Sequence, residues 1–411
     1  LSEDNRSYAY YSASVSALLT RFIDPTEQTF DLFKVRAGYA EVGNDTDPYQ
    51  LSQTFEVPGE GYFGLTTLTA PSVKLNPDLR PEQVTSTEFG LELVMFNNRL
   101  NLDISVYDIS TTDLIFNVPV PAATGYQFFK QNVGEVNNKG FEVTIGGRPI
   151  QSGKFVWDTS LNFARNDNYL VSLIDDVDSF AYLNSNSGDL QLRAQVGGSI
   201  GDIYGTVWET NDSGQNLVTA EGLHVISPAD NLLGNAEPNF IGGWSNLFRY
   251  DNISLSLQID GRFGGEFYSM TARDLDVNGV SAASLQYRDG VTLSGTNTGT
   301  GGANNVAITG QQYWSSQSGI AENYVYDQTN VRLREVALGY QIPNTERFGV
   351  ENASIQLIGR NLFFITKDSR GGTGFGFDPE NMLGTTIGAQ GYQSYAAPSI
   401  RSVGVNLTLN F

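Results

Sequence analysis

The sequence predicts an all-β protein, an antiparallel transmembrane β-barrel, and three observations support this prediction. Apolar and polar residues alternate with a period of two in one segment after another. Short connections alternate with long ones along the chain. The non-apolar face of the strands is mostly small and neutral, whereas a soluble β-sandwich usually carries Lys and Glu on its outside. Alternation alone leaves a soluble β-sandwich or a β-solenoid open as alternatives.

The final segment, IRSVGVNLTLNF, shows the alternation most clearly. Its odd positions from Arg401 to Phe411 are apolar except for Arg401, and its even positions from Ser402 to Asn410 are small or polar. The same pattern predicts eleven strands, near residues 9–22, 30–41, 84–96, 99–113, 138–148, 153–166, 238–250, 252–264, 329–342, 352–366 and 399–411. A strand of about 10 residues, tilted by about 40–45°, spans roughly 25 Å, which is the height of an outer-membrane apolar band.

The connections between these strands alternate in length. The short ones are Asp24–Phe30, Asn97–Arg99, Pro149–Gly153, Asp251 and Pro343–Asn352. The long ones lie at about 42–83, 114–137, 167–237, 265–328 and 367–398. Short periplasmic turns and long extracellular loops are typical of a transmembrane β-barrel, so we expect the long segments to lie outside the cell.

Strand parity indicates that more strands are needed to close the barrel. With eleven strands, the first and the last run in the same direction, whereas bacterial single-chain barrels close with an even number of antiparallel strands. We therefore expect residues 1–411 to be the C-terminal part of a longer barrel chain, and a barrel divided between chains is the alternative. The sequence has no initiating Met and no signal peptide, which fits a mature or partial chain.

Composition excludes several classes of function. The net charge of -21 argues against a nucleic-acid partner, because phosphates would be repelled. The absence of cysteine removes disulfides, thiolate catalysis and the usual zinc sites. No stretch approaches 18 consecutive apolar residues, so no transmembrane helix is expected.

Aromatic residues in the long loops are the predicted substrate contacts, because rings stack on sugar faces and grip peptides at little entropic cost. They are Trp208, Tyr268, Tyr313, Trp314, Phe375, Phe377, Tyr392 and Tyr395. For any one of them, packing within a loop, anchoring at the membrane interface or contact with a lid is the alternative.

Other motifs give weak support for a site. DLDVNG, from Asp274 to Gly279, matches half of a calcium loop, but Leu285 stands where a bidentate Glu belongs, so we expect an ordinary turn. GGTGFGFDPE lacks the context of a phosphate-binding loop. His224 is the only histidine, so a catalytic triad or a His-rich metal site is weakly supported. We expect no enzyme activity, no catalytic residue, no metal and no cofactor.

Several stretches, in order, resemble the C-terminal half of the SusC/RagA family of TonB-linked outer-membrane proteins from Bacteroidetes. They include FKVRAGYAEVGN, LNPDLRPEQVTSTEFGLEL, NVGEVNNKGFEVTIGGRPI, GNAEPNFIGGWSNLFRYDNISLSLQIDGRFGGEFYS, YVYDQTNVRLREVALGYQIP and ASIQLIGRNLFFIT. No single stretch is specific, but the ordered set covers nearly the whole chain. The resemblance implies a 22-stranded barrel of which this chain supplies eleven strands, with a plug domain and TonB box outside this sequence.

The resemblance also implies a function and partners. It implies TonB-dependent uptake of a nutrient, more often an oligosaccharide than a peptide, with a SusD-like lipoprotein as a lid and TonB acting on the plug. Phe411 resembles the terminal aromatic residue that the barrel assembly machinery reads, and outer-membrane lipid and lipopolysaccharide would surround the barrel. A surface glycan-binding or adhesin module without transport, and a passive porin-like half, are the alternative functions.

Overall fold

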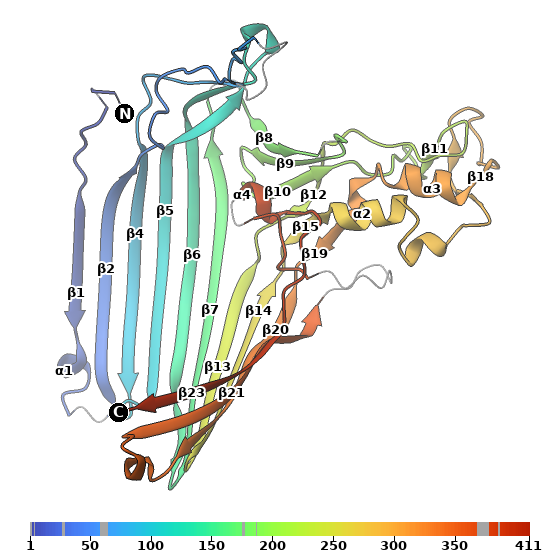
Figure 1. The fold of residues 1–411 in the computed structure, drawn as a ribbon. Helices are drawn as coiled ribbons and strands as arrows, with labels where there is room; N and C mark the ends of the chain where they lie inside the picture. Colours follow the sequence, from blue (N-terminus) through green and yellow to red (C-terminus); the bar gives the residue numbers. More distant parts are fainter. Residues whose placement is uncertain are drawn as a thin grey trace.

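Eleven long strands form one curved antiparallel sheet in the computed structural model (Figure 1). The structure describes residues 2–3, 5–26, 29–57, 65–174, 177–185, 187–367, 378–384 and 387–411. In order across the sheet the strands are β1 (Ser12–Leu18), β2 (Phe30–Asn44), β4 (Glu82–Met95), β5 (Leu100–Pro119), β6 (Phe128–Ser152), β7 (Phe155–Ser172), β13 (Phe240–Tyr250), β14 (Ile253–Phe263), β20 (Asn330–Ile342), β21 (Asn352–Lys367) and β23 (Ser402–Asn410). All eleven predicted strands are therefore confirmed, and each pairs with its neighbour in chain order.

The central strands are longer than the sequence analysis predicted. The segment 114–137, expected as a loop, is largely a continuation of the β5–β6 ladder from Leu114↔Val133 to Pro119↔Phe128. The short strand β3 (Val73–Lys74) joins β6 beside this extension. The alternation of apolar and polar residues is required only where one face of a strand meets lipid. In this extension the alternation is lost although the backbone pairing continues, so the sequence pattern did not reveal the strands.

The two faces of the sheet differ as predicted, and two aromatic levels mark the limits of the apolar face. Near the loop end, Phe141, Phe163, Phe240 and Phe263 form a row across four strands, with neighbouring ring centroids 5.6, 5.0 and 4.5 Å apart. Near the turn end, Trp157 stacks on Phe248 with centroids 5.8 Å apart. The ten steps along β13 from Phe240 to Tyr250, at about 3.4 Å each and a tilt of about 40–45°, correspond to roughly 25 Å of membrane.

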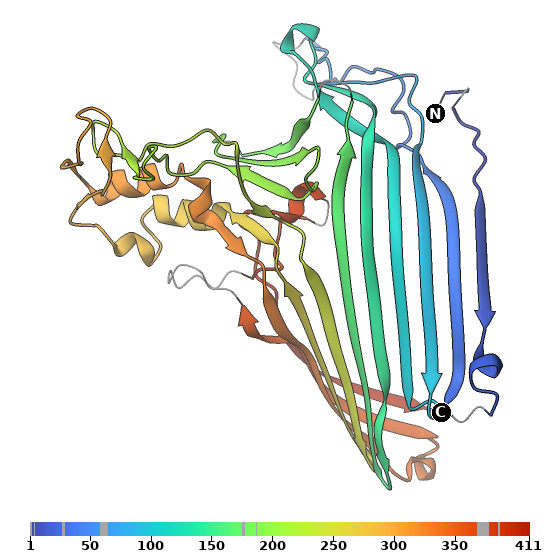
Figure 2. The same ribbon diagram turned by 180° about the vertical axis from the view of Figure 1, so that it is seen from behind.

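Short turns close one end of the sheet and long segments occupy the other (Figures 1 and 2). The turn between β4 and β5 places Phe96, Asn97 and Asn98 at φ near +60°, +58° and +58°, and Asp251 between β13 and β14 has φ +53°. Asn and Asp tolerate this left-handed conformation better than most residues, which is why two to four residues suffice to reverse the chain in these turns.

The long segments fold into a layer beyond the loop end of β7, β13, β14 and β20 (Figure 1). Their strands are β8 (Ser179–Asn184), β9 (Leu190–Gln195), β10 (Asp202–Gly205), β11 (Leu217–Val218), β12 (Asn231–Asn235), β15 (Glu266–Ser269), β16 (Val291–Thr292), β17 (Thr296–Asn297), β18 (Ala307–Ile308), β19 (Val325–Asp327) and β22 (Tyr392–Gln393). The helices are α1 (Thr20–Ile23) at the turn end, and α2 (Met270–Val277), α3 (Gly310–Gln317) and α4 (Ile387–Gln390) in the layer, with short 3-10 turns at Ala122–Thr124, Ala283–Leu285, Ala321–Tyr324 and Thr345–Phe348. The largest buried cluster of the described residues lies in this layer, around Leu192, Ile203 and Tyr268, and not on the long sheet.

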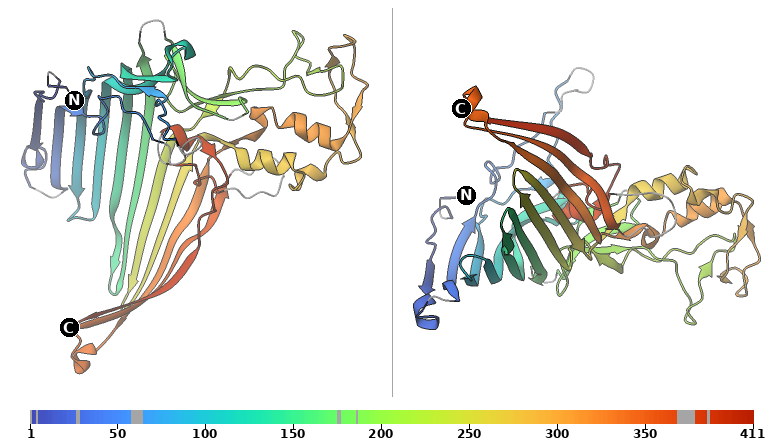
Figure 3. Two further views of the ribbon diagram at one scale, coloured as in Figure 1. Left: turned by 45° about the horizontal axis from the view of Figure 1, so that its top comes forward. Right: turned by 90° about the horizontal axis from the view of Figure 1, so that it is seen from below.

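The sheet is open between its first and last strands. In the described part of the chain, β1 and β23 are edge strands that pair with β2 and β21 but not with each other, and they run in the same direction (Figure 3). None of the helices in the described ranges is both long and apolar enough to cross a membrane.

One polar side chain is buried on the apolar face, and its hydrogen bonds provide a test of that face. Asn246 is 4% exposed and accepts hydrogen bonds from Trp157 Nε1 and Thr159 Oγ1, both at 3.0 Å. Asn246→Ala leaves both donors without this acceptor in apolar surroundings, so we expect a loss of about 1–3 kcal/mol in the free energy of unfolding. Urea unfolding of the full-length protein in phospholipid vesicles measures it.

Ser245→Ala is the matched control, because Ser245 is exposed on the opposite, polar face. The control should change stability by less than about 0.5 kcal/mol. Equal effects of the two substitutions would show that the outward face is not apolar at this level.

Candidate functional site

The polar face of the long sheet is crossed by ion pairs between neighbouring strands. Lys34 Nζ lies 3.0 Å from a Glu92 oxygen, and Arg36 holds Asp103 through two nitrogen–oxygen contacts of 2.9 and 3.1 Å. Arg36 Nε also lies 3.5 Å from Glu88. Between these pairs the face carries small neutral residues such as Ser105, so it offers hydrogen-bonding groups with little net charge. This face suits a water-filled path for polar molecules.

At the loop end, Arg332 of β20 fastens a distant segment to the polar face. Its side chain is 3% exposed, and Nη1 lies 2.9 Å from Glu380 and 3.5 Å from Asp378. Nη2 donates to Ser399 Oγ at 2.5 Å, and the guanidinium carbon lies 4.5 Å from the centre of the Phe364 ring. The buried Arg332 side chain thus joins both ends of the segment 378–399, at Asp378 and at Ser399, to the polar face of the sheet.

Arg334 extends the same network toward β14. Its Nε lies 2.9 and 3.0 Å from the two oxygens of Asp260, and its Nη1 and Nη2 lie 3.0 and 2.5 Å from Glu380. Because Glu380 bridges both arginines, the network behaves as one unit. We call Asp260, Arg332, Arg334, Asp378 and Glu380 the loop-end ion cluster.

Asp378 shows how tightly this cluster is organised. Burial raises the pKa of Asp378, but hydrogen bonds from Ser399 and from the backbone N–H of Glu380, together with the Arg332 charge, outweigh burial and leave the pKa lowered. The carboxylate is therefore ionised at neutral pH, as a partner of a buried arginine must be.

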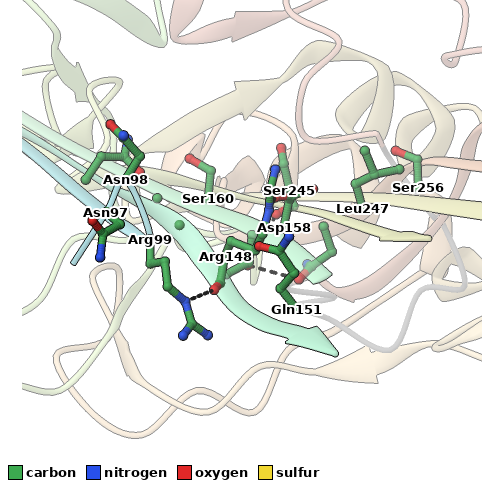
Figure 4. Close-up of a pocket in the computed structure, with 15 residues that line it drawn as sticks. Asn97, Asn98, Arg99, Arg148, Gln151, Asp158, Ser160, Ser245, Leu247 and Ser256 are labelled. Carbon is green, nitrogen blue, oxygen red and sulfur yellow. Dashed lines mark hydrogen bonds and ion pairs between the residues drawn. The ribbon is translucent and has the colours of Figure 1, made fainter. Parts of the chain in front are cut away.

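A second polar site lies on the sheet near the turn end (Figure 4). It is a pocket of about 500 Å³ whose walls include Asn98, Asn101, Arg148 and Asp158. Asp158 accepts from Arg148 at 2.7 Å and from Arg249 at 2.5 Å, so two guanidinium groups share one carboxylate.

Arg99 adds a further cation at this pocket. It donates from Nη2 to the carbonyl of Pro149 at 3.0 Å. Carboxamide, hydroxyl and guanidinium groups together can bind hydroxyl-rich or anionic surfaces.

The aromatic residues predicted to contact substrate occupy different environments. Tyr268 is fully buried, stacks on Tyr392 with ring centroids 5.7 Å apart and donates to Asp189 at 3.1 Å. Tyr392 is 8% exposed, and Tyr395 is 63% exposed with its hydroxyl on Asp274. Phe375 and Phe377 lie outside the described residues. Among the predicted contacts described so far, Tyr395 alone presents a large ring surface to solvent.

Of the remaining three predicted contacts, two pack against His224 and the third packs against one of those two. Trp208 packs edge-on against the imidazole at 4.3 Å, and the Tyr313 ring lies 5.3 Å from it. Trp314 packs beside Tyr313 at 5.0 Å and donates from Nε1 to the carbonyl of Gln286 at 3.2 Å. We call Trp208, His224, Tyr313 and Trp314 the His224 cluster. Its members hold segments 207–227 and 286–317 together.

Burial also sets the charge of His224. The side chain is 4% exposed, Nδ1 lies 2.7 Å from Ser316 Oγ, and Nε2 is buried without a hydrogen-bond partner among the described residues. Burial lowers the pKa of His224 to about 4, so the ring is neutral at pH 7.

The structure also shows where the remaining sequence motifs lie. Asp274–Val277 of the DLDVNG stretch is the end of α2 and not a turn, which corrects that expectation, while Gly279 at φ +70° follows the helix. The described ranges hold no group of three or more acidic or histidine side chains placed to bind a metal. Of GGTGFGFDPE, only Asp378 to Glu380 falls among the described residues. Phe411 is 83% exposed at the end of β23.

The loop-end ion cluster was missed by the sequence analysis. Its arginines stand in VRLREVALGY, where Arg332 and Arg334 sit on either side of Leu333, and a register shift between Leu333 and Glu335 alters the alternation there. Two arginines on either side of Leu333 in a strand rich in apolar residues are the signal that could have indicated a buried pair, because unpaired charge is rarely buried.

Comparisons with known proteins agree with this geometry. A family model described as TonB dependent receptor-like, beta-barrel matches residues 3–198. The chain is 29% identical to TonB-dependent receptor P3 of Formosa agariphila, across 99% of this chain and 42% of the relative. It is 24% identical to TonB-dependent receptor SusC of Bacteroides thetaiotaomicron, across 92% of this chain and 38% of the relative. The chain thus spans less than half the length of these relatives.

Solved structures show the same fold. The structure of the RagAB peptide transporter superposes with a TM-score of 0.75 at 22% identity, over 100% of this chain and 44% of that chain. This similarity covers the long sheet and the layer beyond it together.

Removing Arg332 tests whether the ion cluster fastens residues 378–399. In Arg332→Met, Asp378 stays buried without its cation, so we expect a local loss of about 3–5 kcal/mol and faster hydrogen exchange in 378–384 and 387–399. Hydrogen–deuterium exchange of the full-length protein in detergent measures this directly.

Arg360→Met is the matched control, because the Arg360 side chain is 62% exposed although it pairs with Glu335 at 2.8 Å. Its effect should stay below about 1 kcal/mol. Unchanged exchange of 378–399 in Arg332→Met would contradict the fastening role.

Acidification tests the His224 cluster. The folded-state pKa of about 4 lies below the unfolded value of about 6.5, so the unfolded state binds more protons between these values. The contribution of His224 is present above pH 6.5 and is lost as the pH falls toward 4, on the order of 3 kcal/mol in total.

Tryptophan fluorescence at Trp208 and Trp314 should report this loosening during an acid titration. His224→Phe keeps the ring contacts and removes the titrating group, so its fluorescence should respond less over the same range. An identical response in both proteins would assign the change to another group, such as Asp276, whose pKa is raised by burial.

Proposed function

We propose that this chain is the barrel portion of an outer-membrane protein of the TonB-dependent receptor kind, and that it takes part in active import of a nutrient across the outer membrane. The observation that carries the proposal is the two-faced sheet. Its outward face is apolar between two aromatic levels, and its other face carries paired charges and small polar groups. A surface module without transport has no need of this second, wet face inside a membrane wall.

We propose an oligosaccharide as the imported nutrient. The polar face offers many hydroxyl and carboxamide groups and few unpaired charges, which matches neutral, hydroxyl-rich molecules. Tyr395 supplies an exposed ring in the layer beyond the sheet, where a sugar face could stack. Peptides can use the same groups, so they are the competing substrate class.

Two partners follow from the proposal. A SusD-like lipoprotein would cover the loop end as a lid, and TonB would act through a plug domain that fills the space beside the polar face. The cationic pocket near Arg148 and Arg249 lies at the turn end, which we place on the periplasmic side, where such a plug would meet the wall. Both partners are inferred from the likeness to the receptors and from this layout.

Uptake by intact cells tests the proposal. A strain that lacks the gene should lose accumulation of a labelled oligosaccharide, and the gene should restore it. Accumulation should also stop when an uncoupler removes the proton gradient or when TonB is deleted.

The other outcomes identify the alternatives. Binding of the glycan at the surface without uptake would indicate an adhesin or binding module. Uptake that continues with the uncoupler would indicate a passive pore, and loss of peptide uptake alone would overturn the oligosaccharide assignment.

A further inference from the structure

A groove interrupts the outward face of the sheet next to the row of phenylalanine rings near the loop end, on the side of that row toward the turn end. It has a volume of about 420 Å³ and runs over β7, β13 and β14. Gly242 and Gly261 are paired across β13 and β14 and form its floor. Leu161, Trp244, Ile259 and Val331 stand along its sides.

The two glycines create the groove, because neither has a side chain to fill this part of the apolar surface. A Cβ added at Gly261 would lie 2.8 Å from the Phe263 ring. The ring therefore occupies the space that a side chain at position 261 would need, and glycine is required there. A Cβ at Gly242 would come within 3.3 Å of the backbone oxygen of Asn162 and would point into the groove. The groove is therefore a place where side-chain volume is missing and where contact atoms must come from outside the chain.

The level of the groove within the membrane follows from its neighbours. It lies between the rings of Phe163 and Phe240 and the indole of Trp244, on the loop-end part of the apolar band. Directly beyond the rings the outward face becomes charged, with an ion pair between Arg165 and Asp167 at 3.0 Å. Charged groups at this position mark the depth of lipid head groups, so the groove opens into the hydrocarbon of the adjacent leaflet.

We propose that this groove is a binding site for one acyl chain of an outer-leaflet lipid. The groove is continuous with the membrane-facing surface, which hydrocarbon covers, and a flexible chain can follow a narrow channel that a flat bilayer surface leaves empty. Its two polar residues, Asn162 and Asp260, do not offer hydrogen bonds to a protein partner, because alternation directs their side chains to the opposite face. There Asp260 pairs with Arg334.

Photocrosslinking tests the site in the full-length protein. The protein is embedded in nanodiscs that contain a saturated phosphatidylethanolamine with a diazirine in its acyl chain. We expect crosslinked peptides to concentrate at residues 240–244 and 259–263. Gly242→Leu fills the groove, so labelling there should fall several-fold.

Gly404→Leu is the matched control. It adds the same side chain on the polar face, where a Cβ would meet nothing within 4 Å. Labelling at the groove should stay at the wild-type value. Heat-modified mobility on gels confirms that both variants are folded barrels.

The remaining outcomes would overturn the proposal. Even labelling over the whole outward face would show that the groove has no preferred occupant. Protein–protein crosslinks between copies at 240–244, in place of lipid adducts, would assign the groove to a second copy of the chain. Unchanged labelling in a folded Gly242→Leu variant would also contradict the site.

Discussion

Backbone hydrogen bonding in hydrocarbon is the constraint on which this structure depends. Within the membrane no water pairs with N–H and C=O groups, so every strand must have a neighbour on both sides. This explains the unbroken order of eleven strands and turns as short as the two residues Asp251 and Asn252. It also means that β1 and β23 need further strands, and because they run in the same direction, we infer that an odd number of strands joins them.

Beyond the membrane the constraint is relaxed, and a different source of stability takes over. The layer at the loop end is held by small hydrophobic clusters, by the His224 cluster and by the loop-end ion cluster. Most of its described aromatic rings serve these cores. Tyr268, for example, contributes a buried ring and a hydrogen bond to Asp189, which leaves it no free face for a ligand. A ring on a long loop is therefore weak evidence for substrate binding unless it is also exposed, as Tyr395 is.

The same contrast explains how much the sequence could predict. Period-two alternation is imposed by lipid on one side and water on the other, so it located every long strand. It also showed that the alternate apolar side chains from Ile253 to Ile259 share one face. It could not show that β5 and β6 continue to Pro119 and from Phe128 within the segment 114–137, because both faces of that extension are outside the lipid. The ion cluster joins Arg332 to Asp378 and Glu380 across 46 and 48 residues of chain, and a contact of that separation leaves no local pattern.

The loop-end part of β14 shows how closely the two faces are coupled. Asp260 reaches Arg334 on the polar face, while Ile259 and Gly261, one residue away on either side, line the lipid-facing groove. The register shift between Gln258 and Ile259, opposite Arg334, sits at the same place. A bulge of this kind re-aims one side chain without changing the rest of the ladder. It brings Arg334 to the polar face while Leu333 stays opposite Ile259, so one extra residue supports both the ion cluster inside and the apolar surface outside.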